Sequence, residues 1–219
     1  MPIQHTNDRV LQTMNRRLTK KKLFNLVENL RREIPEIVFR TSIIVGFPGE
    51  TEEEFQELCD DLEQLQLDHV GVFRYSREEG TPAALMEGQI HPATKRARAK
   101  HLIKLLQSQS LKRNERFVGR TVVALIEGVS EESDLFYQAR MSTQAQEIDG
   151  RILINDINPV VGRLGTGDLV SIQISEALPH DLVGKVTGLI SRSKKYDEST
   201  SLGDYTSGTI QVHSSSHFA

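Results

Sequence analysis

Apolar residues recur at helical spacing in the first part of the chain. The earliest run follows a helix start signal at Thr6-Asn7-Asp8 and predicts a short helix. Its apolar positions are Val10, Leu11 and Met14. A second helix is predicted from Thr19 to Arg32, because Pro35 lies just beyond its end. The apolar stripe of this second helix consists of Leu23, Leu26, Val27 and Leu30.

The next pattern reads as a strand, a helix and a strand. Residues 37–46 are rich in β-branched side chains and predict a buried strand that ends at the turn Phe47-Pro48-Gly49. Thr51 and Glu54 have the spacing of a capping box and predict a helix that extends to about Leu65. Residues 68–75 predict the second strand. A strand–helix–strand unit of this length predicts two parallel strands.

A loop and a long helix follow this unit. Residues 76–92 contain several Gly and Pro residues and predict a loop, and residues 93–116 predict a helix. The inward positions of this helix are predicted to be Leu102, Leu105, Leu106 and Leu111. Its basic residues are expected to face solvent, so that the helix serves as a connector; they are Lys95, Arg96, Arg98, Lys100 and Lys104.

After Phe117 the pattern changes to short apolar-rich runs separated by Gly, Asp, Asn and Pro. Five such runs occur: VVALIEGV, LFYQARM, GRILIND, LVSIQIS and LVGKVTGLI. They predict a small antiparallel barrel of OB-like design over residues 117–190. The last stretch, residues 191–219, is rich in Ser, Thr and Gly and is expected to be disordered.

The charge of the chain is distributed unevenly. Residues 1–116 hold 19 Lys and Arg against 17 Asp and Glu, whereas residues 117–190 hold 5 against 10. An acidic barrel is poorly suited to nucleic acid and better suited to a basic protein. No apolar run approaches the roughly 18 residues of a membrane span, and the amino terminus lacks the pattern of a secretory signal. We therefore expect a cytoplasmic protein without a membrane contact.

The most specific local motif is the segment from Ile43 to Thr51, IIVGFPGET. Gly46 and Gly49 permit a tight turn at the carboxyl end of a strand, which is where parallel α/β folds bind ligands. From these residues alone, an ordinary strand-to-helix turn is the favoured interpretation. A phosphate-binding P-loop is excluded, because Glu50 stands where that motif requires a lysine.

Read as strings, this motif and its neighbours resemble the radical-SAM methylthiotransferases. The GFPGET string is a signature of that family, and three further segments match it in the same order. These are Pro2 to Arg17 (PIQH, DRVL and MNRR), Val72 to Ala83 (VFRYSREEGTPA), and the five-strand module, which is similar to the family's TRAM domain in its QEIDG and HDLVG runs. The strings QH, EEG and EIDG resemble the branch that methylthiolates an aspartate of a small-subunit ribosomal protein.

The resemblance implies a fold, cofactors and partners. The expected fold class is α/β plus all-β, with an incomplete radical-SAM (β/α) barrel and connecting helix over 1–116 and a five-stranded, OB-like TRAM barrel over 117–190. The family uses S-adenosylmethionine and two 4Fe-4S clusters, each held by several cysteine thiolates. This sequence contains only Cys59, inside a predicted helix, and it therefore offers none of the cluster ligands. We expect no catalytic and no metal-binding residue within it.

The resemblance also implies one wall of the S-adenosylmethionine pocket. The cofactor-binding residues that it assigns lie near the ends of strands, and they are Gln4, His5, Arg40, Ser42, Gly46, Glu50, Phe73, Tyr75 and Ser76. From chemistry alone, Arg40 is equally well a strand-edge charge. For His5, a capping or core histidine is the favoured interpretation. Adjacent Glu78 and Glu79 are interpreted as solvated loop residues rather than an acid–base pair.

Taken together, the chain is expected to be the carboxy-terminal part of such an enzyme, arising from truncation, a split gene or a misplaced start. The expected partners are a basic small-subunit ribosomal protein, which the TRAM barrel would bind, and a separate amino-terminal half. Alone, the chain is expected to be inactive. Two alternatives remain open: a non-enzymatic TRAM module that binds a basic protein, and a fragment of a tRNA methylthiotransferase.

Overall fold

The computed structural model describes residues 2–130, 133–146 and 149–193, and the chain divides into two compact units, Met1–Ser110 and Leu111–Ala219. The helix that the sequence predicts over 93–116 is α5 (Pro92–Glu115), and the division falls within it. No helix among the described residues is long and apolar enough to cross a membrane.

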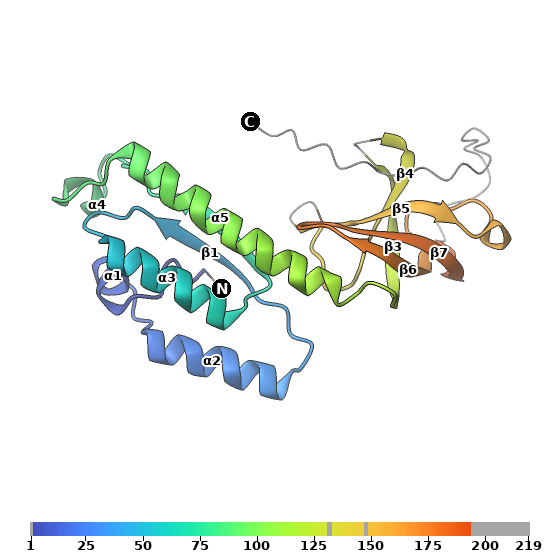
Figure 1. Cartoon of the computed structure of the whole chain (residues 1–219), viewed down its shortest axis with the longest axis horizontal. Coiled ribbons are helices and arrows are strands. Elements are labelled where there is room, and N and C mark those ends of the chain that lie inside the picture. Colours follow the sequence, from blue (N-terminus) through green and yellow to red (C-terminus); the bar gives the residue numbers. More distant parts are fainter. Residues whose placement is uncertain (1, 131–132, 147–148, 194–219) are drawn as a thin grey trace. The chain divides into compact units, whose positions relative to one another are not determined.

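The helices of the first unit begin where the sequence places their start signals. The unit contains α1 (Asp8–Thr13), α2 (Lys20–Glu33) and α3 (Glu52–Leu65) (Figure 1). Asn7 and Thr19 cap α1 and α2 through their side chains. Both halves of the capping box between Thr51 and Glu54 are present at α3. The predicted loop over 76–92 also contains α4 (Pro82–Leu85), a single turn that the sequence analysis did not predict.

Two parallel strands form the sheet of the first unit, which confirms the predicted strand–helix–strand arrangement. They are β1 (Arg40–Val45) and β2 (His69–Arg74), and Gln4 forms a parallel bridge to Ile43 on the other side of β1. The strand predicted from residue 37 begins three residues later. The reason is that β2 pairs with β1 only from Arg40 onwards, and the Ile37 amide instead donates to the Ile34 carbonyl in a turn after α2.

One face of this sheet packs on the helices. Ile43 and Val45 of β1 are fully buried against side chains of α2, α3 and α5, and Val70 and Val72 of β2 pack against the same core. Leu102 of α5 is fully buried, and Leu105 and Leu106 are partly buried beside it, as their spacing predicts. The opposite face of β1 and β2 takes no part in this core.

The second unit is a closed five-stranded barrel. Its strands are β3 (Thr121–Ser130), β4 (Ser133–Arg140), β5 (Ile152–Ile157), β6 (Leu169–Ala177) and β7 (Leu182–Ser191), in the order β3-β4-β5-β7-β6. A short 3-10 helix, η1 (Pro159–Val161), follows β5. All five predicted runs are strands, and the OB-like barrel is confirmed.

The expectation of a purely antiparallel barrel was wrong, because β5 and β7 pair in parallel. Strand direction in a closed ring can alternate throughout only if the number of strands is even. A closed barrel of five strands must therefore contain a parallel pair. The mixed sheet follows from the strand count and from closure together.

The barrel ends in a fixed segment rather than directly at β7. Buried Asp168 accepts hydrogen bonds from the Arg192 guanidinium at 3.0 Å and from the Ser193 amide at 2.9 Å. The predicted disorder was therefore wrong for residues 191–193. The rest of the predicted tail, residues 194–219, lies outside the described residues.

Candidate functional site

The turn after β1 is supported from within by Glu50. Gly46 and Gly49 have φ values of 75° and 78°, which a glycine adopts without strain. The chain reverses between these two glycines. As a result, Oε2 of Glu50, the next residue, accepts hydrogen bonds from the amides of Gly46 and Phe47. The Glu50 side chain is fully buried, and Nη1 of Arg98 lies 3.2 Å from its Oε1 atom. Glu50 thus fixes the turn that precedes α3.

Arg98 carries the countercharge for this turn. It comes from α5, is 7% exposed, and also donates to the Glu50 carbonyl at 3.2 Å and to Oε2 of Glu52 at 2.9 Å. The expectation that Arg98 faces solvent was therefore wrong. Burial raises the pKa of Glu50, and the nearby Arg98 charge and the two backbone N–H groups oppose that rise.

A second set of contacts holds the turn from outside. The Arg9 guanidinium donates to both carboxylate oxygens of Glu54 and to the Gly49 carbonyl. Its hydrogen bond lowers the pKa of Glu54. The Gly49 amide donates to the Gly88 carbonyl at 2.9 Å. The turn is therefore held by α1, by α3 and by the segment before α5.

The sheet face opposite the helices carries a distinct set of side chains. The strand register places Ser42 beside Gly71 and Ile44 beside Phe73 on this face. Phe73 is 57% exposed, and its ring lies 3.1 Å from the position that a Cβ atom on Gly71 would occupy. The absence of a side chain at Gly71 therefore leaves room for the ring. This face offers an aromatic and aliphatic surface next to the turn.

Tyr75 and Lys95 meet at the carboxyl ends of both strands. The Tyr75 amide donates to the Val45 carbonyl at 2.9 Å and extends the parallel pairing beyond β2. The Tyr75 ring contacts Phe47 edge-on, with 5.3 Å between centroids. Lys95 of α5 donates from Nζ to the Tyr75 carbonyl at 3.1 Å, and Nζ lies 4.7 Å from the Tyr75 ring centroid.

Of the other predicted residues, Gln4 and Ser76 adjoin the sheet, whereas His5 lies inside the unit. Gln4 has a φ of 75° and pairs through its backbone with β1, and exposed Ser76 follows Tyr75. His5 is fully buried, and its Nδ1 accepts from the Asn7 amide at 3.0 Å. Burial lowers the pKa of His5 to about 4, partly offset by nearby Glu54 and Glu57. His5 is thus neutral and packed inside the unit.

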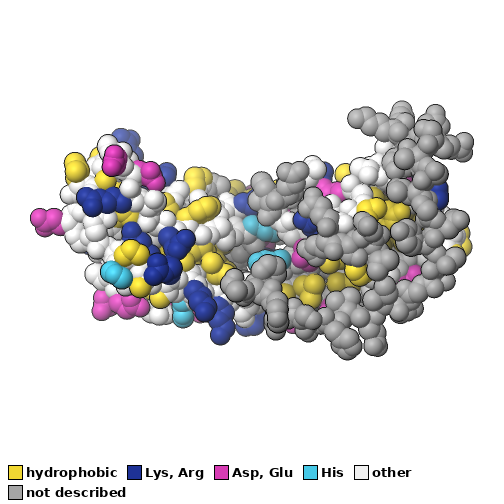
Figure 2. All heavy atoms as spheres, turned by 90° about the horizontal axis from the view of Figure 1, so that it is seen from above, with side chains coloured by type: hydrophobic (Ala, Val, Ile, Leu, Met, Phe, Trp, Pro, Cys, Tyr) yellow, Lys and Arg dark blue, Asp and Glu magenta, His cyan; other side chains and the backbone are white. Residues whose placement is uncertain are grey.

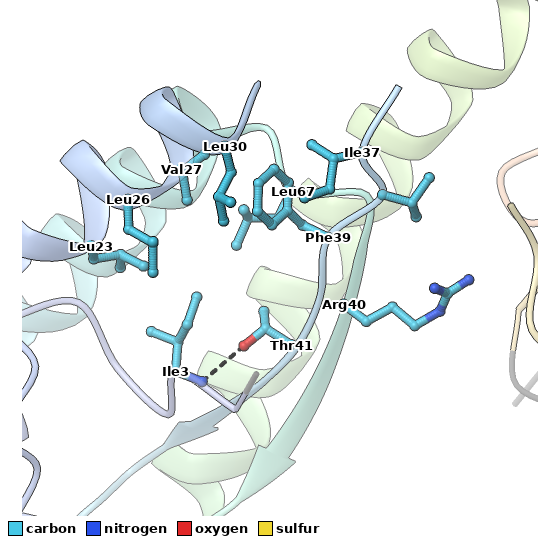
Figure 3. A pocket seen from close by; sticks show the side chains of 11 residues that line it. Ile3, Leu23, Leu26, Val27, Leu30, Ile37, Phe39, Arg40, Thr41 and Leu67 are labelled. Atoms are coloured by element: carbon cyan, nitrogen blue, oxygen red, sulfur yellow. Dashed lines mark hydrogen bonds between the residues drawn. The ribbon is translucent and has the colours of Figure 1, made fainter. Parts of the chain in front are cut away.

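Arg40 lies apart from this group, at the amino-terminal end of β1. It borders an apolar cavity of about 230 Å³, and its side chain points away from that cavity (Figure 3). The cavity is lined by Ile3, Leu23, Leu26, Val27, Leu30, Ile37, Val38, Phe39, Thr41 and Leu67. The polar side chains of Glu50 and Lys95 lie near the other, carboxyl end of β1. The candidate site is therefore the carboxyl edge of the sheet.

Seven of the nine predicted residues therefore lie in one region, and the other two, His5 and Arg40, lie elsewhere. Gln4, Ser42, Gly46, Glu50, Phe73, Tyr75 and Ser76 lie on or beside the exposed sheet face and its carboxyl edge. Sequence analysis did not predict that Lys95 reaches this edge or that Arg98 contacts Glu50 in the turn. A signal was available, because Lys95, Arg98 and Leu102 share one helix face by spacing.

Other basic residues of α5 do face solvent, as expected. Arg96, Lys100 and Lys104 are exposed. Figure 2 views the chain from above the orientation of Figure 1, and it shows Lys and Arg side chains on that side of the first unit.

Comparisons with known proteins identify the family. The chain matches the Radical SAM superfamily over residues 1–62 and the TRAM domain over 118–187. It is similar to the ribosomal protein uS12 methylthiotransferase RimO of Bdellovibrio bacteriovorus, with 44% identity over 85% of the chain and 40% of that relative. The corresponding protein of Geobacter sulfurreducens is 46% identical over the same shares. The chain belongs to the RimO-type radical-SAM methylthiotransferases. It spans about 40% of the length of these curated relatives.

Membership in this family implies S-adenosylmethionine and 4Fe-4S clusters, and the residues present fit the two differently. Cys59 is the one cysteine of the chain; it is buried in α3, and burial, followed by Asp60 and other nearby acidic groups, raises its pKa to about 11. A protonated, buried thiol is not a cluster ligand, and one thiol could not hold a cluster. Among the described residues, no group of three or more His, Cys, Asp or Glu is arranged to bind a metal.

The exposed sheet face does fit part of S-adenosylmethionine. The half-exposed Phe73 ring, with Ile44 beside it, suits a flat nucleobase, and Lys95 at the carboxyl edge suits an anionic group. These residues form an open surface in the described part of the chain and do not enclose a ligand by themselves.

Proposed function

We propose that the chain acts as the carboxy-terminal part of a radical-SAM enzyme that adds a methylthio group to an aspartate of a small-subunit ribosomal protein. The observation that carries this proposal is the similarity, over 85% of the chain, to relatives named ribosomal protein uS12 methylthiotransferase. The similarity includes both units, so the sheet with its braced turn and the barrel belong to one enzyme type.

In this proposal the two units have separate tasks. The sheet of the first unit supplies a wall for S-adenosylmethionine through Ser42, Ile44 and Phe73, and the turn at Gly46 is held rigid by Glu50. Held against this wall, S-adenosylmethionine would provide the radical chemistry that the reaction needs. The barrel supplies a surface for the protein substrate. Polypeptide that carries the cluster cysteines completes the active site.

The acidity of the barrel supports a protein substrate over tRNA. Among the described residues of the second unit, three ion pairs involve barrel carboxylates: Glu127 with Arg140, Asp156 with Lys185 and Asp168 with Arg192. Its other acidic residues still outnumber the remaining basic ones. Four of these other acidic residues lie outside the residues whose side chains are described: Glu131, Glu132, Asp134 and Glu147. A basic ribosomal protein complements this charge.

Complementation tests the proposal. The chain is co-expressed with the amino-terminal portion of the Geobacter relative, and the pair is reconstituted anaerobically with iron and sulfide. Mass spectrometry of ribosomal protein uS12 is expected to show a methylthio group on one aspartate only when both polypeptides are present. A chain with Phe73→Ala should reduce this product. Modification of tRNA in place of uS12 would support the tRNA alternative, and binding of uS12 without modification would support the non-enzymatic module.

A further inference from the structure

The Lys95 side chain crosses the turn at the end of β1. Its Cγ atom lies 2.5 Å from the place that a Cβ on Gly46 would occupy, and its Cδ lies at 3.2 Å. Real Cβ atoms do not approach other atoms so closely, so a side chain at position 46 would displace the lysine. Gly46 therefore permits both the turn and the passage of Lys95 to the carboxyl edge of the sheet.

At that edge the Lys95 ammonium has weak partners only. Nζ donates to the Tyr75 carbonyl and lies over the Tyr75 ring. No carboxylate of the described residues forms an ion pair with Lys95. Its neighbour Arg98, by contrast, is paired with Glu50 and Glu52. An ammonium group has three N–H donors, and a single carbonyl uses one of them.

The position of this cation points to a ligand. Parallel α/β sheets bind ligands beyond the carboxyl ends of their strands, and Lys95 bridges the residues that directly follow β1 and β2. We propose that Lys95 is a binding residue for a carboxylate held at the carboxyl edge of the sheet. This inference rests on the proposed function, in which two carboxylates reach this edge: that of the methionine part of S-adenosylmethionine and that of the target aspartate.

The environment of Lys95 agrees with this assignment. Partial burial lowers the pKa of Lys95, and no carboxylate of the described residues forms an ion pair that would oppose this shift. A bound carboxylate opposes the shift and forms a charge-assisted hydrogen bond.

A titration of the chain itself tests the inference without turnover. The Cε resonances of 13C-labelled lysines are followed while N-acetylmethionine, or the N-methylamide of N-acetylaspartate, is added. A saturable shift of the Lys95 resonance is expected with one of the two probes. Lys100, exposed on the same helix, is the matched control. A Lys95 response no larger than that of Lys100 with either probe would overturn the proposal.

A second measurement identifies the source of the carboxylate. Lys95→Met keeps the aliphatic stem over Gly46 and removes the charge, and Lys100→Met is its control. In the assembly with the amino-terminal portion, calorimetry compares S-adenosylmethionine with its decarboxylated analogue. If the cofactor supplies the carboxylate, Lys95→Met weakens only the former, by about ten- to a hundredfold, as for a hydrogen bond between charged groups.

The other outcomes are also informative. If the aspartate supplies the carboxylate, cofactor affinity is unchanged and the same loss appears in the affinity for uS12. Unchanged affinity for both, in a folded variant, contradicts a binding role for Lys95. An inactive assembly with Lys95 intact contradicts the proposed function, whereas the titration of the chain alone still decides the role of Lys95.

Discussion

Glu50 and Arg98 hold opposite charges at a place that solvent barely reaches. A buried pair is costly to form, and the removal of one partner leaves the other charge without compensation. Glu50 also occupies the amides of Gly46 and Phe47, so its role in the turn is larger than that of one ion pair. The resemblance assigned Glu50 to the cofactor; its carboxylate points into the turn, where it acts on the ligand edge by holding its shape.

Glu50→Ala should therefore lower the free energy of unfolding of the first unit by about 3 kcal/mol. Urea unfolding followed by helical circular dichroism measures it, because the α-helices of the described residues begin in that unit. Glu52→Ala is the matched control. Its side chain is 72% exposed, and it should cost less than about 1 kcal/mol. Equal losses in the two variants would show that the turn does not depend on Glu50.

His5 provides a pH-dependent signature of the same region. Its pKa falls from 6.5 to about 4 on folding because of burial, so the unfolded chain binds more protons between these values. Stability from the neutral imidazole is complete above the unfolded pKa and is lost as pH falls toward the folded one. The loss approaches about 3 kcal/mol.

Unfolding free energies across this pH window should therefore decline less steeply for His5→Gln than for the parent chain. The difference between the two curves is the measurement, because it removes the contribution of titratable groups that do not interact with His5. His91→Gln, at the exposed start of α5, should follow the parent. A parent curve that coincides with that of His5→Gln would contradict the buried, neutral state of His5.

At the scale of elements, local signals in the sequence determined most of the fold. Capping residues and apolar periodicity located α1, α2, α3 and α5, since these signals act over a few residues. The start of β1 could not be located in this way, because it depends on where β2 begins to pair, about 29 residues away. The parallel pair in the barrel depends on closure, and the inward path of Lys95 depends on the packing of α5.

Glycines in β7 give a test of barrel packing within one strand. A Cβ on Gly184 would lie 2.6 Å from a methyl of Ile172 and 2.8 Å from the Gln173 carbonyl, whereas one on Gly188 would meet its nearest atom at 4.0 Å. Gly184→Ala should destabilise the barrel by about 2–3 kcal/mol through overpacking, and Gly188→Ala should be nearly neutral. Thermal unfolding followed by near-ultraviolet circular dichroism distinguishes them. Similar midpoints for both variants would contradict the tight β6–β7 contact.

At the scale of the whole chain, each unit has its own hydrophobic core. The proposed function assigns one role to each unit: a wall for the cofactor to the first, and a surface for the protein substrate to the barrel. The described strands of the barrel close into a ring, whereas β1 and β2 form an open two-stranded sheet. The first unit is therefore the part that gains most from additional polypeptide, and the barrel is the part equipped to act as a binding module.

The whole chain should bind a basic small-subunit ribosomal protein more tightly than tRNA, because the barrel is acidic. Attraction between opposite charges weakens as salt reduces the screening length below about 10 Å, so the affinity should fall with added salt. Fluorescence anisotropy with labelled protein and labelled tRNA, at low and high salt, measures both. Tighter, salt-dependent binding of tRNA would contradict a protein substrate.

The buried state of Cys59 also has a practical consequence. With a pKa raised to about 11 and no exposure to solvent, its thiol reacts slowly with maleimides and similar labels at neutral pH. A cysteine introduced at an exposed position would thus carry a dye or spin label almost alone, without removal of the native residue. Distances between such labels could then report how a complementing polypeptide approaches the sheet. Any iron bound by the assembly would be assigned, by the same reasoning, to thiolates of that polypeptide.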